Sequence, residues 1–108
     1  MYLPAGCLAH ARRRFVAALE AGDLRAAIPL RRIQQVYLVE RRAQQDGCDA
    51  QERLRRRQQH SEPLMTQLRQ QAEALGAQAP PKTPLGRAIT YLLRQWGSLQ
   101  RRCELLPC

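Results

Sequence analysis

The chain has 108 residues, of which 44% are apolar and only 5% aromatic. That is enough for one small domain whose core must consist mainly of leucine and alanine, which favours helices. Eighteen basic residues against nine acidic ones give a formal charge of +9 at pH 7, so nucleic acid or an anionic membrane surface is the expected class of partner. No apolar run approaches the roughly 20 residues that span a bilayer, and the N-terminus lacks the pattern of a secretion signal.

The four cysteines are scattered along the chain without a paired spacing. Because no export signal is visible, the sequence predicts reduced thiols in a cytoplasmic protein rather than disulfides. These cysteines are Cys7, Cys48, Cys103 and Cys108.

Two clear breaks, at residues 44–49 and 76–84, are rich in glycine, proline and small polar residues. With a smaller break at Gly22-Asp23 they divide the chain into about four segments of helical periodicity, and no segment shows sustained alternation. The prediction is therefore an all-α fold. Residues 2–8 are the one stretch that could form a short strand, and Pro4 weakens that interpretation.

The first two helices are predicted over residues 8–21 and from Asp23 to about residue 44. Gly22 stands where the first helix would stop, and Asp23 is a favourable N-cap for the second. Pro29 would interrupt the middle of a helix, so we expect it in the first turns. The apolar positions of the second helix are Ile28, Leu30, Ile33, Val36, Tyr37 and Val39.

The third helix is predicted to begin at Asp49, which has the form of a capping box with Glu52 three residues later. Pro63 predicts a bend or a one-turn break close to it. The fourth helix has the strongest signal, with Thr83 as N-cap, Pro84 in the first helical position, and an apolar seam of about five turns. The seam consists of Leu85, Ile89, Leu92, Trp96, Leu99 and Cys103.

Two segments carry a resemblance to a known family. Residues 6–15 read G-C-L-A-H-A-R-R-R-F, and residues 81–96 read P-K-T-P-L-G-R-A-I-T-Y-L-L-R-Q-W. They resemble the G-C-W-A-H-A-R-R-K-F-like and P-K-S-P-L-G-K-A-I-x-Y-x-L-x-Q-W-like segments of the insertion-sequence sixty-six family of bacterial DDE transposases. Residues 57–64 also resemble the R-x-x-x-S-x-P-L-like middle of that family. Leu8 stands where tryptophan is usual, which removes an aromatic anchor.

In that family these segments lie between the second catalytic aspartate and the final glutamate. The resemblance implies the helical insertion domain of a ribonuclease-H-like DDE transposase. It makes residues 1–8 the end of a core strand, residues 8–104 the helical insertion, and residues 105–108 a divergent tail.

The resemblance also implies a role in DNA transposition and recombination by a mobile element, with DNA and other transposase subunits as partners. It places the protein in the bacterial cytoplasm, associated with the nucleoid. The parent enzyme is expected to use divalent cations such as magnesium, whereas this chain is expected to hold no cofactor. We expect a truncated fragment that lacks the catalytic carboxylates and is catalytically incomplete on its own.

Cys7 and His10 are the sharpest candidates for chemistry, since a thiolate and an imidazole at this spacing could ligate one zinc ion. A structural zinc site needs four ligands, however, and no further pair is visible. The residues alone favour a buried cysteine and a hydrogen-bonded histidine. Several DDE transposase groups carry a C-x-x-H string at this place, so the resemblance makes the pair a family signature rather than a metal site.

Metal-dependent phosphoryl transfer needs several converging carboxylates, and the nine acids form no plausible pair. Asp23, Asp49 and Glu52 are explained by helix capping. Most of the others stand singly among arginines and glutamines, as on solvated helix faces. The sequence therefore predicts no catalytic residue in this chain.

Arginines occur in clusters, and a helical triplet diverges by about 100° per residue, so it cannot present one flat face. Each cluster is either a solvated face or a set of phosphate contacts. The shortage of balancing acids favours phosphate contact for the set as a whole. The candidates for nucleic-acid binding are Arg12, Arg13, Arg14, Lys82 and Arg87.

Two alternatives to a transposase fragment remain open. One is a free-standing basic helical module that binds nucleic acid non-specifically, and the other is a helical protein that binds a partner through an uncovered apolar face. A salt titration of DNA binding and light scattering, respectively, would discriminate them from the main hypothesis.

Overall fold

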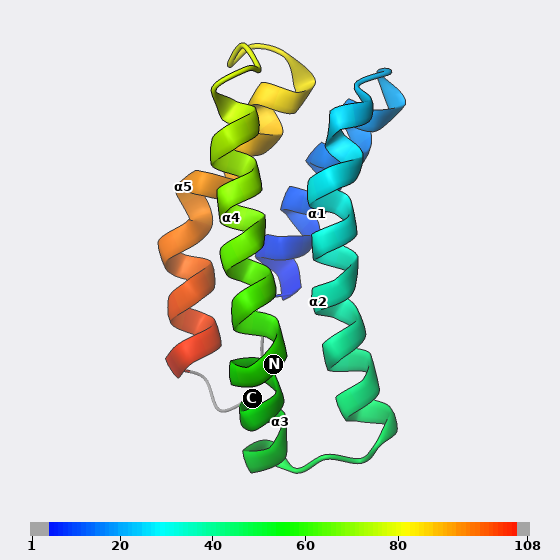
Figure 1. The fold of residues 1–108 in the computed structure, drawn as a ribbon, viewed down its shortest axis with the longest axis vertical. Helices are drawn as coiled ribbons and strands as arrows, with labels where there is room; N and C mark the ends of the chain where they lie inside the picture. The colour runs from blue at the N-terminus through cyan, green and yellow to red at the C-terminus, as the bar shows by residue number, and fades with distance from the viewer. Residues whose placement is uncertain (1–4, 106–108) are drawn as a thin grey trace.

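A computed structural model describes residues 5–105 of the chain and the side chains of residues 8–96. Four helical segments run alternately in opposite directions along the long axis of a body measuring 42 × 24 × 20 Å (Figure 1). They are α1 (Ala5–Glu20), α2 (Ala27–Gln45), α3 (Ala50–Arg56) continued by α4 (Glu62–Gly76), and α5 (Pro84–Leu105).

The described residues contain no strand, which confirms the all-α prediction. The strand considered for residues 2–8 is wrong over residues 5–8, because α1 begins at Ala5. The remainder of that stretch lies outside the described residues. Pro4, which precedes Ala5 in the sequence, disfavours a strand there.

The connection between α1 and α2 follows local chemistry. Gly22 has a φ of 100°, a left-handed conformation that glycine adopts without a steric penalty. Asp23 accepts a hydrogen bond from the Arg25 N–H at 3.2 Å and caps η1 (Leu24–Ala26), the single 3-10 turn before α2. Pro29 is the third residue of α2, where its missing N–H costs no helical hydrogen bond, as predicted.

The helix that begins after Asp49 changes type at its middle. Between α3 and α4 the chain makes one wide turn of π-helix, η2 (Arg57–Ser61), which is closed by a hydrogen bond from the Glu62 N–H to the Arg57 carbonyl. Pro63 follows directly and would crowd the carbonyl four residues before it in a regular helix. The predicted interruption is therefore present, but it takes the form of a π turn that lies just before the proline.

The start of α5 is held by two features of the preceding loop. Thr83 donates its hydroxyl to the Pro80 carbonyl at 2.7 Å and accepts from the Gly86 N–H at 3.1 Å, which confirms it as the N-cap. A Cβ atom at Gly86 would lie 2.0 Å from the Pro80 carbonyl oxygen. Only glycine lets the loop approach α5 this closely.

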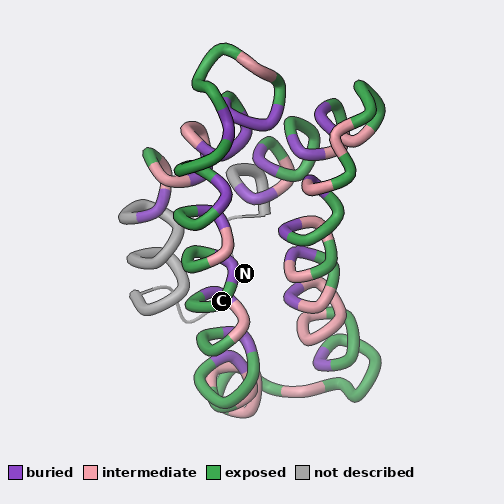
Figure 2. The backbone as a smooth tube through the Cα atoms, turned by 45° about the horizontal axis from the view of Figure 1, so that its top comes forward, coloured by how far each residue is buried: buried purple, intermediate pink, exposed green. Residues whose placement is uncertain are grey.

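The four helical segments form a closed ring in which α1 packs on α2, α2 on α4, α4 on α5, and α5 on α1. Figure 2 shows the buried residues on the inner side of the described helices. Trp96 is buried, as predicted. Leu99 and Cys103, also predicted for the seam, have side chains outside the described part. Residues at 0% exposure that form the core include Leu8, Phe15, Ile33, Val36, Leu68, Leu85 and Leu92.

One apolar position of the second predicted helix does not belong to the core. Ile28 is 46% exposed, and its neighbour Leu24 is 77% exposed. Both lie at the corner where the chain turns from α1 into α2. The buried residue at this corner of α2 is Pro29, which directly follows Ile28. Within α2, the periodic pattern predicts the inner face correctly only after this corner.

Candidate nucleic-acid interface

The two motif segments lie at opposite ends of the sequence and pack against each other in the fold. Residues 6–15 belong to α1 and residues 81–96 cover the loop before α5 and most of α5. The antiparallel packing of α1 on α5 brings them together (Figure 1). The residues that carry the resemblance therefore form one side of the molecule.

The arginine triplet on α1 diverges as helical geometry requires. Arg12 and Arg13 line an open groove between α1 and α2. Arg14 points instead toward α5, where its Cζ atom lies 4.5 Å from the centre of the Tyr91 ring. All three arginines are exposed. The triplet thus spreads positive charge over both flanks of α1.

The groove between α1 and α2 receives two further arginines from α2. Arg31 and Arg41 line it opposite the α1 pair, and both are exposed. Its apolar walls come from both helices and include Val16, Leu19 and Leu30. Sequence reasoning did not select Arg31 or Arg41, because their position beside α1 depends on how the helices pack.

The other predicted candidates lie near the start of α5. Lys82 is exposed in the loop, and Arg87 is exposed in the first turn of the helix. Arg87 lies one helical turn before Tyr91, so both belong to the stripe of α5 that faces Arg14. Arg94 lies three residues beyond Tyr91, on the same side of the helix, and is exposed.

The positive charges of this side of the molecule have no carboxylate partners among the described residues. Among the residues whose side chains are described, no acid lies within 4.0 Å of the guanidinium groups on the two flanks of α1. An unpaired guanidinium keeps its full charge and its N–H donors for an external anion. These residues, which we call the basic face, are Arg12, Arg13, Arg14, Arg31, Arg41, Arg87 and Arg94.

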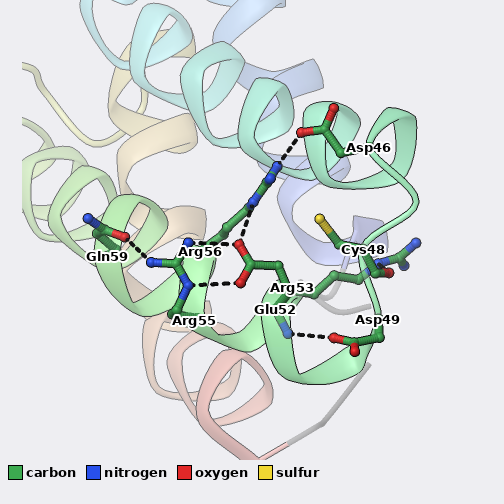
Figure 3. Close-up of polar contacts among 8 residues, drawn as sticks. All are labelled: Asp46, Cys48, Asp49, Glu52, Arg53, Arg55, Arg56 and Gln59. Carbon is green, nitrogen blue, oxygen red and sulfur yellow. Dashed lines mark hydrogen bonds and ion pairs between the residues drawn. The ribbon is translucent and has the colours of Figure 1, made fainter.

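Arg55 and Arg56, near the turn between α2 and α3, are paired with acids. In the close-up of Figure 3, Glu52 accepts hydrogen bonds from Arg55 at 2.7 and 2.8 Å and from Arg56 at 3.0 Å. Arg56 also binds Asp46 at 2.8 Å. The hydrogen bond from Arg55 and then that from Arg56 lower the pKa of Glu52 from 4.5 to about 2. This arginine cluster therefore has little free charge to offer to an anion.

Asp49 and Glu52, both predicted to cap α3, play different roles at the start of that helix. Asp49 accepts a hydrogen bond from the Glu52 N–H at 2.8 Å, so its role as N-cap is confirmed (Figure 3). The prediction that Glu52 serves as a cap is wrong, because its carboxylate turns to Arg55 and Arg56 instead. Two neighbouring guanidinium groups attract the carboxylate more strongly than one backbone N–H does.

A buried ion pair joins α2 to the π turn. Arg57 is only 3% exposed, and its guanidinium forms a two-point contact with Glu40, with Nη2 to Oε2 at 2.8 Å. Glu40 also lines the groove between α1 and α2, but its carboxylate is bonded to Arg57. Among the described residues it forms no ion pair with the arginines of the basic face.

The predicted signature pair is only partly described. His10 is exposed, and its Nδ1 atom lies 3.4 Å from the Tyr91 hydroxyl oxygen. The side chain of Cys7 lies outside the described residues, so the relation between the two stays a prediction. Within the described part of the chain, no group of three or more histidine, cysteine, aspartate or glutamate residues could hold a metal ion.

Divalent-cation chemistry does not fit the acids that the structure describes. Most of their carboxylates are occupied by arginines or backbone N–H groups, and none converge. Nor is any described helix both long and apolar enough to cross a membrane. What the surface offers is an array of unpaired cations, which suits the binding of a polyanion.

Comparison with known proteins supplies the context for this surface. The sequence model of a family described as "Transposase IS66 family" matches residues 2–105. A relative named "Uncharacterized protein y4jD", from Sinorhizobium fredii (strain NBRC 101917 / NGR234), is 35% identical over 94 residues. The match covers 86% of the present chain but only 18% of that relative. No solved structure matches the chain.

Proposed function

We propose that this chain, which belongs to the Transposase IS66 family, is a helical segment of a transposase and binds the phosphate groups of DNA. Membership of the family implies a role in transposition. More specifically, we propose that the chain is the helical insertion of a DDE enzyme. The catalytic carboxylates and divalent cations of that enzyme would lie elsewhere in the complete transposase.

The observation that carries this proposal is the distribution of paired and unpaired arginines. The basic face contains seven arginines that no described carboxylate neutralises, whereas Arg55, Arg56, Arg57 and Arg69 each hold an acid. Phosphate oxygens on DNA would supply the missing partners and release condensed counterions. The basic face therefore contains most of the arginines that no described carboxylate neutralises.

The binding that this surface supports is independent of sequence. Guanidinium groups that contact phosphates fix the position of a protein on the duplex but carry no base information. The arginines of α1 and α2 flank an open groove rather than project from one helix edge. We therefore propose backbone contact, with the recognition of transposon ends assigned to other parts of the transposase.

A pair of charge-matched triple variants tests the proposal. One variant changes Arg12, Arg13 and Arg31 to glutamine, and the other changes Arg25, Arg55 and Arg69, which are ion-paired with Asp23, Glu52 and Glu73. Both remove the same formal charge. Fluorescence anisotropy with a short DNA duplex at about 50 mM salt gives the affinities, and circular dichroism verifies the helix content.

We expect the first triple variant to bind duplex DNA roughly tenfold more weakly for each phosphate that it no longer binds. The second should stay close to the unmodified chain, because its arginines are already neutralised locally. Equal weakening of the two variants would mean that only net charge matters and would reject the basic face. Absence of duplex binding by the unmodified chain at this salt concentration would reject the proposed function itself.

A further inference from the structure

Three side chains of different chemistry meet where α1 packs on α5. His10 and Arg14 lie one turn apart on α1, and Tyr91 comes from α5. Arg14 lies over the tyrosine ring at 4.5 Å, and the Tyr91 hydroxyl oxygen lies 3.4 Å from His10 Nδ1. The cluster takes residues from both motif segments, and no contact between the two segments was predicted from the sequence.

Stacking on Tyr91 orients Arg14 without consuming its hydrogen-bond donors. A guanidinium above an aromatic ring keeps its N–H groups directed outward in its own plane, where they can bind an oxyanion at two points. Among the described residues no carboxylate contacts Arg14. The side chain is therefore held in position and its charge is free.

The hydroxyl of Tyr91 is not explained by packing. The ring is half-buried and packs at the edge of the core, which a phenylalanine would do equally well. The 3.4 Å separation from His10 Nδ1 exceeds the usual length of a hydrogen bond from a hydroxyl, so this contact is weak. The hydroxyl can consequently turn to a stronger acceptor beside it.

We propose that Arg14, Tyr91 and His10 form a clamp for one phosphodiester group of the DNA backbone, an inference that rests on the proposed function. Arg14 donates two N–H groups, Tyr91 donates its hydroxyl, and His10 donates a ring N–H to the phosphate oxygens. Arg87 and Arg94, one turn to either side of Tyr91 on α5, contact neighbouring phosphates. The clamp fixes α1 and α5 to the same DNA strand.

The chemistry of the cluster favours a phosphate over a base. All three groups can donate hydrogen bonds, and an ionised phosphodiester offers acceptors only. Two flanking arginines add positive charge without an acid between them. Among the base edges only that of guanine presents a pair of acceptors, whereas every phosphate offers acceptors alone.

The two histidines of the chain provide an internal comparison. His10 belongs to the clamp, whereas His60 is exposed on the π turn, away from α1 and α5. The ring nitrogen signals of both can be followed by NMR while a short DNA duplex is added. The clamp predicts a saturable shift for His10 and no comparable shift for His60; equal responses of the two rings would overturn it.

Point variants separate the clamp from the rest of the basic face. Tyr91→Phe keeps the stacking ring and removes only the hydroxyl, so duplex affinity should fall about fivefold with an unchanged salt dependence. Arg14→Gln should weaken binding and reduce the salt slope by about 0.9. The matched control is Arg69→Gln, because Arg69 also lies over an aromatic ring, that of Trp96 at 5.8 Å, but already holds Glu73.

The outcomes distinguish the two proposals. If the unmodified chain binds duplex DNA and the triple variant of Arg12, Arg13 and Arg31 weakens it while Tyr91→Phe and Arg14→Gln do not, the clamp is wrong and the basic face stands. If the unmodified chain binds no duplex at all, both proposals fail together.

Discussion

The ion pair between the buried Arg57 and the partly buried Glu40 connects the π turn to α2. Arg57 is almost fully enclosed between α2 and the π turn, and Glu40 meets it with both carboxylate oxygens. Burying such a pair stabilises a protein little, because the removal of hydration offsets the attraction between the charges. Removing Glu40 is costly, because the Arg57 guanidinium stays buried while it loses its ion-pair partner.

We predict that Glu40→Ala lowers the free energy of unfolding by about 3 kcal/mol. The matched control is Glu73→Ala, which removes a 3.8 Å ion pair with Arg69 between two half-exposed side chains and should cost less than about 1 kcal/mol. Urea denaturation followed by circular dichroism measures both. Similar losses of stability in the two variants would contradict the assigned burial of Arg57.

The lowered pKa of Glu52 leads to a prediction of how the stability of the fold depends on pH. Hydrogen bonds from Arg55 and Arg56 lower its pKa from 4.5 to about 2. A carboxylate with a lowered folded-state pKa stabilises the fold above its ordinary pKa, and that contribution disappears as the pH falls through the lowered value. The stabilisation by Glu52 should therefore be complete above pH 4.5 and vanish toward pH 2.

Carbon-13 NMR of the side-chain carboxyl groups tests this directly. The Glu52 signal should titrate with a midpoint near 2, and the double change of Arg55 and Arg56 to glutamine should return the midpoint toward 4.5. A midpoint for Glu52 near its ordinary value in the unmodified chain would show that the contacts in Figure 3 do not persist in solution.

At the scale of the elements, the junction between α4 and α5 is the most constrained. The loop of residues 77–83 folds back so closely that the Pro80 carbonyl occupies the place where a side chain at Gly86 would begin. A shift of the Pro80 carbonyl would break its hydrogen bond with the hydroxyl of Thr83, the N-cap of α5. The glycine of the second motif segment is thus required by packing rather than by chemistry.

We predict that Gly86→Ala destabilises the fold by about 3 kcal/mol, because the new Cβ meets backbone atoms. Gly76→Ala, at the other end of the same loop, meets only the Ile89 side chain at 3.3 Å and gains helix propensity. Its stability should stay within about 1 kcal/mol of the unmodified chain. Thermal unfolding distinguishes the two; an innocuous Gly86→Ala would refute the close approach.

The elements were predictable where their signals are local. Asp49 and Thr83 cap helices as expected, since a capping side chain acts on a backbone N–H within three residues. Asp23 caps the 3-10 turn before α2 rather than α2 itself, whose N-cap is Ala26. The π turn was not predictable as such, because Pro63 demands a relief of crowding but does not select its form. The exposure of Ile28 was also missed, since a periodic pattern does not reveal where a corner shifts its phase.

At the scale of the whole molecule, the candidate site was predictable only in part. The sequence indicated Arg12, Arg13 and Arg14 from their clustering and from the family resemblance. Helical geometry predicted that the triplet diverges, but the sequence could not show which neighbours each arginine meets, or that Arg31 and Tyr91 join them from other helices. Those relations follow from which helices pack together, and no local pattern encodes that.

The closed ring of helices therefore has a functional consequence. It places the two motif segments side by side (Figure 1) and assembles the basic face around α1, while Arg55 and Arg56 are paired with acids near the turn between α2 and α3 (Figure 3). The same total charge spread evenly would give weak, unoriented attraction to any polyanion. The concentrated arrangement supports a defined contact with DNA.

The salt dependence of duplex binding by the unmodified chain tests the central claim most directly. If about five of the basic-face arginines contact phosphates, the logarithm of the binding constant should fall with the logarithm of salt concentration at a slope of about −4 to −5. A slope near zero, or no binding even at about 50 mM salt, would contradict the account, because the unpaired arginines would then have no phosphate partners.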